Sequence, residues 1–236
     1  MLHHGVLDDL GLRIATGALA SGTVLTTAGL QESYGVSRTV VREILRVLES
    51  MGMVSQRRRV GITVRPRHEW NALDRRLITW NLAGPGRRAE LGSLMELRVA
   101  IEPVAARLAA TRATPEDRAE LLRLAVLLRE LGSRGLGEDE EYLAVDMAFH
   151  RLMLGASGNA MFSGMLGDVI GEVLVGRTRL GLSPSVPVAE ALDLHEEAAR
   201  AVIDGDGEAA ERAIRGVVEE AHRAALAEAT AARLPE

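Results

Sequence analysis

One candidate binding site is a pair of side chains in the segment DMAFH, residues 146–150. Asp146 and His150 are four positions apart, so in a helix both side chains lie on one face. A carboxylate beside an imidazole can ligate a divalent metal ion. A second imidazole could come from His195, in the segment LDLHEEAARAVI, which also has helical spacing. Spacing alone equally allows a surface Asp–His pair and an unrelated histidine.

A second group of functional side chains is a row of arginines. Arg38, Arg42 and Arg46 recur every four residues, so they share one face of a predicted helix. Like charges at this spacing weaken an isolated helix by about 0.2–0.5 kcal/mol per pair. The helix therefore gains if an anion such as a nucleic-acid phosphate neutralises the row. The alternative is a charged face in contact with solvent alone.

The elements around this row are predicted from residues 30–65. Ser37 is a natural N-cap for the arginine-bearing helix, and Gly52 stands where that helix would be closed. The apolar positions with helical spacing are Val40, Val41, Ile44, Leu45, Leu48 and Met51. Beyond Gly52 the period changes to two, with a basic tip at 57–59 and a turn glycine, Gly61. This order is the outline of a winged helix-turn-helix.

Length and composition limit the classes of protein. The 236 residues suffice for two modest domains. The absence of cysteine excludes disulfides and thiolate metal sites. No apolar run reaches membrane-spanning length and no signal-peptide pattern is present, so we expect a soluble cytoplasmic protein without a membrane partner.

Charge is distributed unevenly along the chain. Residues 1–70 contain nine Arg and six acidic residues, a net charge of +3, whereas residues 71–236 contain 19 Arg and 27 acidic residues, a net charge of −8. A basic first part on an acidic body is typical of a DNA-binding head joined to a second domain.

The rest of the chain is predicted to be helical. We expect helices at 6–18 and 69–82, and then at 87–112, 115–133, 138–157, 159–180, 188–204 and 206–231. The prediction is a mainly α protein with a winged helix-turn-helix domain at 1–68, a linker helix and hinge at 69–86, and an all-helical effector-binding and dimerisation domain at 87–236. The linker helix either carries a signal between the domains or only connects them.

The first part of the chain resembles a known family. The stretch GVSRTVVREILRVLESMGMV, preceded by ATGALASGTVL, is similar to the DNA-binding domain of the GntR family of bacterial transcription regulators over about the first 65 residues. It departs from the family pattern at Ile44, usually Ala, and at Val60, usually Gly. The resemblance implies double-stranded operator DNA as partner and a DNA-contacting set of Ser37, Arg38, Thr39, Arg42, Arg46, Arg58, Arg59 and Gly61.

The second part resembles the all-helical FCD effector domain of the FadR subfamily, from about residue 88 to 225. The matching segments are ELRVAIEP, D..FH.L, GN and H…A…GD…A. In metal-binding members one Asp and three His hold a Zn²⁺, Ni²⁺ or similar ion. Asp146, His150 and His195 fall on three of these positions, but Val217 stands where the third histidine is usual. Three outcomes stay open: a metal with three protein ligands, a metal-free site that binds effector directly, or Glu220 as a further ligand.

Arginines of the second part are candidates for effector binding. Arg98 and Glu102 are four apart in the ELR..IEP segment, so Arg98 either binds an effector carboxylate or forms a salt bridge within the helix. Arg177 is a weaker candidate of the same kind. The segment EWNALDRRLITW is most similar to sugar-acid regulators, those answering gluconate or galactonate. Lactate, another hydroxy acid and a fatty acyl effector remain alternatives.

These features predict a ligand-responsive transcription regulator, a repressor, that binds a palindromic operator as a homodimer. Two alternatives belong to other classes. A metal-dependent hydrolase fused to a DNA-binding head would show turnover in the 87–236 fragment. An architectural DNA-binding protein would show no effector response. We expect no enzyme, because the sequence offers no obvious general base, no phosphate-binding glycine loop and no Ser–His–Asp arrangement.

Overall fold

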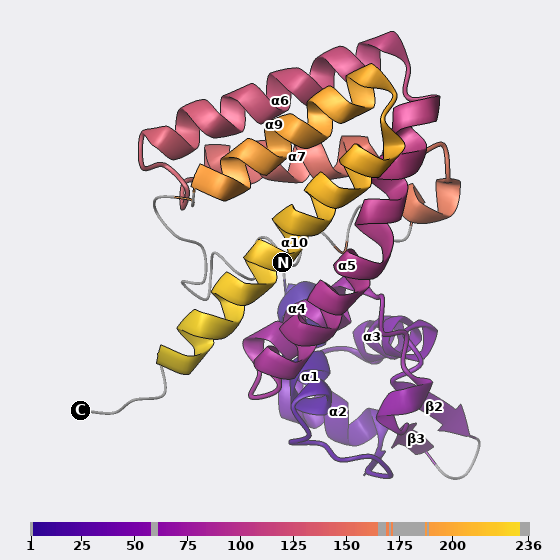
Figure 1. The fold of residues 1–236 in the computed structure, drawn as a ribbon. Helices are drawn as coiled ribbons and strands as arrows, with labels where there is room; N and C mark the ends of the chain where they lie inside the picture. Colours follow the sequence, from indigo (N-terminus) through magenta and orange to yellow (C-terminus); the bar gives the residue numbers. More distant parts are fainter. Residues whose placement is uncertain are drawn as a thin grey trace. The chain divides into compact units, whose positions relative to one another are not determined.

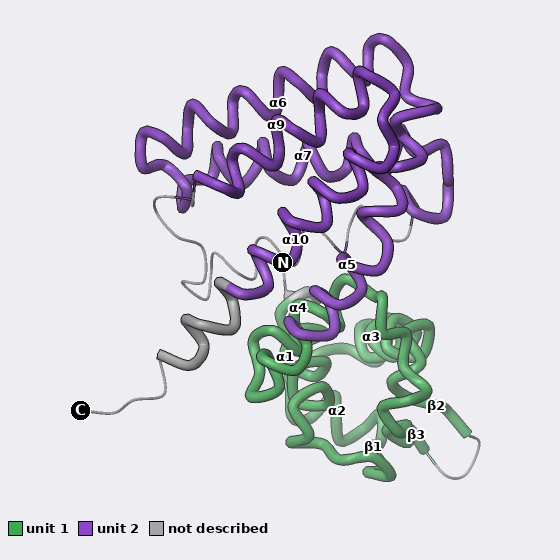
Figure 2. The backbone as a smooth tube through the Cα atoms, viewed as in Figure 1, with its two compact units in different colours: residues 1–90 green, residues 91–236 purple. Residues whose placement is uncertain are grey.

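The fold is described from a computed structural model, in which residues 2–57, 61–164, 169, 171, 187 and 189–231 are described. The chain divides into two compact units, residues 1–90 and residues 91–236, shown in different colours in Figure 2.

Unit 1 is built around three helices, α1 (Leu2–Ala15), α2 (Thr27–Tyr34) and α3 (Arg38–Ser50), labelled in Figure 1. The Ser37 side chain accepts from the backbone N–H of Val40 and caps α3, as the sequence predicts. Gly35 and Gly52 follow α2 and α3 with φ of 63° and 75°, a backbone region in which glycine has no steric penalty. The predicted arginine-bearing helix is thus confirmed at both ends.

A small antiparallel sheet completes the winged fold. Its strands are β1 (Val24–Leu25), β2 (Val54–Arg57) and β3 (Gly61–Val64), in the order β1-β3-β2. The predicted hairpin corresponds to β2 and β3. The sequence prediction missed β1, because two residues are too few to show an alternating pattern.

The linker segment differs from its prediction. A single helix over residues 69–82 is wrong at its start: a 3₁₀ turn spans Arg67–Glu69, and α4 spans Arg75–Ala83. The helix begins late because the Asp74 side chain accepts from the backbone N–H groups of Arg76 and Leu77 and so acts as its N-cap.

The α4 helix packs on α1 within unit 1. Trp80 is 5% exposed, and its Nε1 donates to Asp8 Oδ1 at 3.2 Å. A Cβ atom at Gly11 would come within 2.2 Å of the Trp80 ring, so a glycine is required where the ring lies on α1. Leu77 and Trp80 belong to the same apolar cluster as Leu48 and Val64. The linker helix is therefore part of the core of unit 1.

Unit 2 is a helical bundle. It contains α5 (Arg87–Arg112), which begins in unit 1, and α6 (Pro115–Ser133), α7 (Glu140–Ala156), α9 (Ala189–Asp204) and α10 (Gly207–Ala231). The α6 helix packs against α7 and α9, and α9 packs against α10, as Figure 1 shows. These bounds agree with the predicted helices within two residues. Most of the predicted helix at 159–180 lies outside the described residues.

Candidate functional site

Two helices of unit 2 bring together the predicted metal-binding side chains. Asp146 and His150 extend from one face of α7, and His195 extends from α9. Asp146 Oδ1 lies 3.5 Å from His150 Nε2 and 3.3 Å from His195 Nε2. Both imidazoles are buried, and Asp146 keeps 14% of its side chain exposed. The three groups therefore share one point in the interior of the bundle.

The orientation of His195 is set by the backbone of its own helix. Its Nδ1 lies 2.7 Å from the carbonyl oxygen of Ala191. A carbonyl only accepts, so Nδ1 carries the proton and Nε2 is the atom free to ligate. Nε2 is buried and has no hydrogen-bond partner among the residues that the structure describes. A buried nitrogen that faces a carboxylate oxygen without a hydrogen bond is the arrangement a bound cation would satisfy.

His150 is held from the opposite side by α5. Its Nδ1 lies 2.7 Å from Glu102 Oε2, an ion-pair contact that is not aligned as a hydrogen bond. Arg98 Nη2 is 3.3 Å from His150 Nε2. Arg98 and Glu102 also form the predicted pair within the helix, with Nε donating to Oε1 at 2.5 Å. This pair is buried, because the two side chains are 1% and 2% exposed.

Phe149 packs against both imidazoles, and the two imidazoles also contact each other, with ring centroids 5.6 Å apart. Its ring makes edge contacts with both, at centroid distances of 5.6 Å to His150 and 5.0 Å to His195. The Phe149 side chain is completely buried. The three rings therefore pack against one another in the interior of unit 2.

The pKa values show how strongly these charges interact. Burial alone would raise the pKa of Glu102, but the charges of Arg98 and His150 lower it to about 2. Burial alone would lower the pKa of His150, but Glu102 and Asp146 outweigh it and raise the value to about 9. The two histidines likewise hold the pKa of Asp146 well below its usual value against the effect of burial. The acidic groups are therefore ionised and available as ligands, whereas His150 would have to release a proton from Nε2 when it binds a metal ion.

The donor set fits a divalent metal ion. The ligand atoms of Asp146, His150 and His195 all lie within 4.8 Å of one another. Bonds of about 2.0–2.1 Å in a tetrahedral site would separate neighbouring ligand atoms by roughly 3.3 Å, close to the two distances from Asp146. Val217 is buried on α10 and offers no ligand atom. Within the described residues the group has three members, which leaves a position for water or an exogenous ligand.

A row of arginines on α3 forms the second candidate site. Arg38, Thr39 and Arg42 are exposed near the start of the helix. Arg46 is different, because its Nη1 donates to Glu43 Oε1 at 2.6 Å. Glu43 thus neutralises the last arginine of the row, whereas the structure shows no ion pair for Arg38 or Arg42 among the described residues. A free cationic patch is left at the N-terminal half of α3.

The wing is tied to α3 at its base. Glu49 accepts from the backbone N–H of Gln56 at 3.3 Å and from its side-chain amide at 3.2 Å. Gly61 begins β3 with φ of 104°, a conformation that side chains rarely adopt. The predicted DNA-binding residues Arg58 and Arg59, and the predicted effector residue Arg177, lie outside the described residues.

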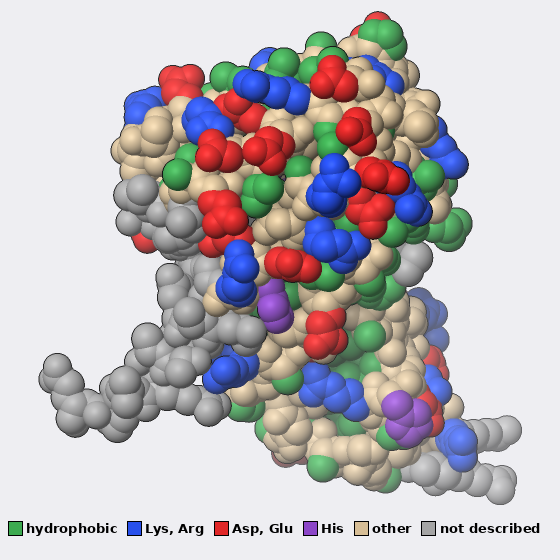
Figure 3. Space-filling model, in the orientation of Figure 1, with side chains coloured by type: hydrophobic (Ala, Val, Ile, Leu, Met, Phe, Trp, Pro, Cys, Tyr) green, Lys and Arg blue, Asp and Glu red, His purple; other side chains and the backbone are tan. Residues whose placement is uncertain are grey.

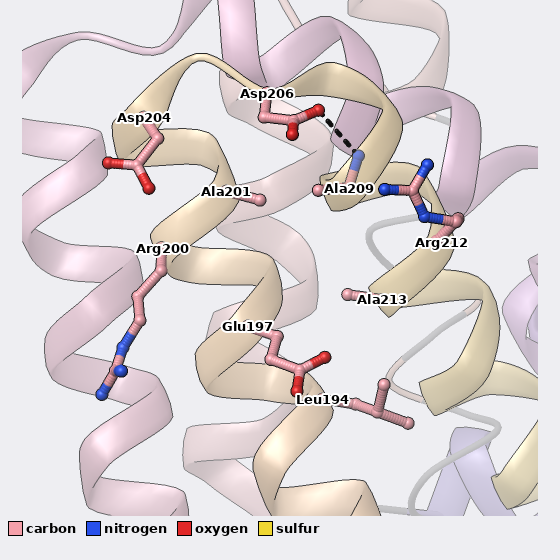
Figure 4. Close-up of a pocket in the computed structure, with 9 residues that line it drawn as sticks. All are labelled: Leu194, Glu197, Arg200, Ala201, Asp204, Asp206, Ala209, Arg212 and Ala213. Atoms are coloured by element: carbon pink, nitrogen blue, oxygen red, sulfur yellow. Dashed lines mark hydrogen bonds between the residues drawn. The ribbon is translucent and has the colours of Figure 1, made fainter.

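One pocket of unit 2, of about 440 Å³, lies away from the three-ligand cluster. Figure 4 shows it between α9 and α10, with Leu194 and Glu197 facing Ala209 and Ala213. In Figure 3 acidic and arginine side chains alternate over the visible face of unit 2. Neither feature gathers groups of one chemical kind, so the buried cluster remains the better candidate for ligand binding.

Comparisons with known proteins agree with the division of the chain into two units. The family described as bacterial regulatory proteins, gntR family, matches residues 2–64, and the FCD domain matches residues 93–220. The chain belongs to the GntR family, with an FCD domain. Families of this kind are transcriptional regulators, and their match confirms the predicted recognition, fold class and regulatory function.

Three similar proteins place this GntR-family chain among relatives of the same length. The Escherichia coli K12 protein YieP, an uncharacterized HTH-type transcriptional regulator, is 33% identical over 92% of each chain. The galactonate operon transcriptional repressor of the same organism is 28% identical over 88% of this chain and 90% of its own. The solved structure of E. coli McbR/YncC has a TM-score of 0.54 at 22% identity, covering 97% of this chain and 99% of that one, and shows the shared fold.

Some parts of the site were beyond sequence reasoning. The contact between Glu102 and His150 joins two helices, and no spacing rule links them. The carbonyl of Ala191 is a backbone group, so its residue type gives no signal. Of the helices that the structure describes, none combines the length and apolar character needed to cross a membrane.

Proposed function

We propose that this GntR-family protein is a repressor that binds a palindromic operator as a homodimer and changes its operator affinity when a small carboxylate, such as a sugar acid, binds its FCD domain. The observation that carries the proposal is the convergence of Asp146, His150 and His195 beside the buried Arg98. We call residues 1–68, the proposed DNA-binding domain, the reader. Residues 87–236, the proposed effector-binding domain, are the sensor, and residues 69–86 are the linker and hinge.

The reader would contact DNA through the first half of α3. Arg38, Thr39 and Arg42 are exposed on the part of the helix that enters the major groove in winged helix-turn-helix proteins. An unpaired guanidinium can donate two hydrogen bonds to a guanine edge. Ser37, as the cap of α3, lies beside this patch. We therefore propose that these residues determine which operator sequence the protein recognises.

The wing and the end of α3 would set affinity more than sequence choice. Arg46 already has a carboxylate partner, so its contribution to phosphate binding is reduced. Gly61 begins β3 with φ of 104°, and in the sequence it follows shortly after Arg58 and Arg59. Contacts from such groups to phosphates strengthen binding to any sequence and make it salt-dependent.

The sensor would use two kinds of group for a carboxylate effector. Asp146, His150 and His195 would hold a divalent ion of the Zn²⁺ or Ni²⁺ type, which supplies positive charge and open coordination positions for effector oxygens. Arg98 has a buried Nη1 that lacks a hydrogen-bond partner among the described residues and could donate to the effector carboxylate. The similarity to a galactonate operon repressor supports a sugar acid as the first ligand to test.

The experiment begins by selecting operator sequences from a random DNA pool with the full-length protein. The affinity for the selected duplex is then measured by fluorescence anisotropy while galactonate is added in the presence of Zn²⁺. We expect the operator affinity to fall as galactonate binds. The His195→Ala variant should bind the same duplex but lose the galactonate response, since the reader is unchanged.

Gluconate and lactate are tested beside galactonate, because they share its hydroxy-acid chemistry. An operator affinity that none of these acids alters would contradict the sensor half of the proposal. A pool from which no preferred sequence emerges would contradict the reader half and favour the architectural alternative.

A further inference from the structure

Glu102 is a buried carboxylate that holds two side chains of the site at once. Its Oε1 accepts from Arg98 Nε at 2.5 Å, and its Oε2 accepts from Arg98 Nη2 at 3.3 Å. The same Oε2 lies 2.7 Å from His150 Nδ1. The Glu102 side chain is only 2% exposed, so solvent does not weaken these attractions as it would at the surface.

The contact with His150 decides which of its nitrogens faces the cluster. The negative charge of Glu102 Oε2, 2.7 Å from Nδ1, favours a proton on that nitrogen. Nε2 is then the atom turned toward Asp146. His195 is oriented in the same sense by the backbone carbonyl of Ala191. The ring of His195 is thus oriented by a neutral backbone carbonyl of its own helix, and the ring of His150 by a charged carboxylate from α5.

The contact with Arg98 leaves part of the guanidinium unused. Nε and Nη2 both donate to Glu102, and Nη2 also lies 3.3 Å from His150 Nε2, whereas Nη1 is buried and has no hydrogen-bond partner within the described part of the chain. A buried N–H group without a partner is unfavourable, and more so when it is charged. An arginine fixed through two nitrogens with its third unsatisfied is prepared to donate to an added acceptor.

We propose that Glu102 is the positioning residue that couples the two halves of the sensor. The cation half is the cluster of Asp146, His150 and His195, and the anion half is Arg98. It orients His150 Nε2 toward the cation position and orders Arg98 for an incoming carboxylate. Because one side chain orders both halves, filling one half lowers the cost of ordering the other, and the two ligands bind cooperatively. This inference rests on the proposed sensor function of the same site.

An ordinary salt bridge within a helix would not have this effect. Arg215 and Glu211 on α10 form one at 3.2 Å, with the same four-residue spacing, and Glu211 also lies 3.4 Å from Arg107 of α5. That pair is partly exposed, at 41% and 24%, and no histidine contact is recorded for it in the described part of the chain. Glu211→Gln is therefore the matched control for Glu102→Gln, with the same chemical change outside the cluster.

The first measurement follows the His150 Nδ1 proton by NMR of protein labelled with ¹⁵N-histidine. Full-length wild type and Glu211→Gln should show a protonated Nδ1 that exchanges slowly with water, with or without Zn²⁺. Glu102→Gln should lose this protection, because it removes the negative charge that favours the proton on Nδ1. A protected Nδ1 proton in Glu102→Gln would overturn the positioning role, whatever Zn²⁺ does.

The second measurement follows the two ligands by chelator competition for Zn²⁺ and by calorimetry for galactonate. Glu102→Gln should weaken Zn²⁺ binding about 10–100-fold, the usual effect of removing an outer partner of a metal-bound histidine. It should also weaken galactonate binding and abolish the mutual dependence of the two. Arg98→Met should keep the His150 Nδ1 signal and Zn²⁺ binding but lose galactonate.

The outcomes separate this inference from the proposed function. If wild type binds neither Zn²⁺ nor galactonate, the sensor function fails, while the NMR result still decides whether Glu102 positions His150. If wild type binds both and Glu102→Gln binds both equally well, the sensor function stands and the coupling role of Glu102 is refuted. Should Glu102→Gln unfold, Glu102→Asp, which keeps the charge on a shorter side chain, replaces it and must shift both affinities.

Discussion

The two units of this protein treat their arginines in opposite ways. In unit 1, Arg38 and Arg42 are exposed on α3, and the core beneath them is apolar. In unit 2, Arg98 is buried with Glu102, His150 and Asp146 in the middle of the bundle. An exposed guanidinium is hydrated and stays accessible to a large polyanion, whereas a buried guanidinium needs an anionic partner within the protein. The first arrangement suits DNA, and the second suits a small ligand that completes an almost satisfied network.

The largest expected effect comes from breaking the buried network. Glu102→Leu leaves Arg98 without its main anionic partner and should cost about 3–5 kcal/mol of the unfolding free energy of unit 2. Both tryptophans of the chain, Trp70 and Trp80, lie in unit 1. Far-UV circular dichroism should therefore show an early loss of helix, while tryptophan fluorescence keeps the wild-type transition. Coincident early transitions would show that the units do not respond separately.

The next effect concerns DNA recognition in unit 1. Arg38→Ala should cost about 1–3 kcal/mol of operator binding, or about 5–150-fold in affinity, because a base-edge contact is lost. Zn²⁺ binding by the same variant should be unchanged. Operator affinity is measured on the selected duplex, and Zn²⁺ affinity is measured by chelator competition. Arg46→Ala is the control on the same helix, and an equal loss there would refute the distinction between the two arginines.

The packing of the apolar core of unit 1 is tested where the linker helix α4 contacts α1. Gly11→Ala places a methyl group in the Trp80 ring, where a Cβ would come within 2.2 Å. Such overpacking should cost about 1–3 kcal/mol of the unfolding free energy of unit 1. The tryptophan fluorescence transition should shift to lower denaturant. Gly5→Ala on the same helix meets no atom within 4 Å and serves as the control.

The smallest effect is expected at the exposed ion pair of α3. Arg46 and Glu43 are about 60% exposed, at 61% and 60%. Removing the pair by Glu43→Gln should change the unfolding free energy of unit 1 by less than about 0.5 kcal/mol. The same variant should raise affinity for DNA slightly at low salt, since Arg46 is released. A destabilisation near that of Glu102→Leu would contradict the contrast between buried and exposed pairs.

Sequence reasoning was most successful where the information is local. The Ser37 cap, the glycine after α3 and the four-residue spacing of Asp146 and His150 are set by neighbours along one helix, and each was found from the sequence. The start of α4 was misplaced because Asp74 offers a cap that competes with the apolar pattern before it.

The remaining features depend on contacts between helices. Bringing His195 to the other two ligands requires α9 to lie beside α7, which the resemblance to the FCD domain implied and periodicity could not. The link from Glu102 to His150 was not predicted, because the sequence pattern of α5 shows only the pair with Arg98.

The most direct test of the central claim is a calorimetric titration of metal-free protein with Zn²⁺. Wild type should bind one ion per chain at the cluster of Asp146, His150 and His195, and His195→Ala should lose most of that affinity while its operator binding stays intact. Wild-type protein that takes up no ion, or a His195→Ala variant that binds it as tightly, would contradict the assignment of these three residues as a cation site.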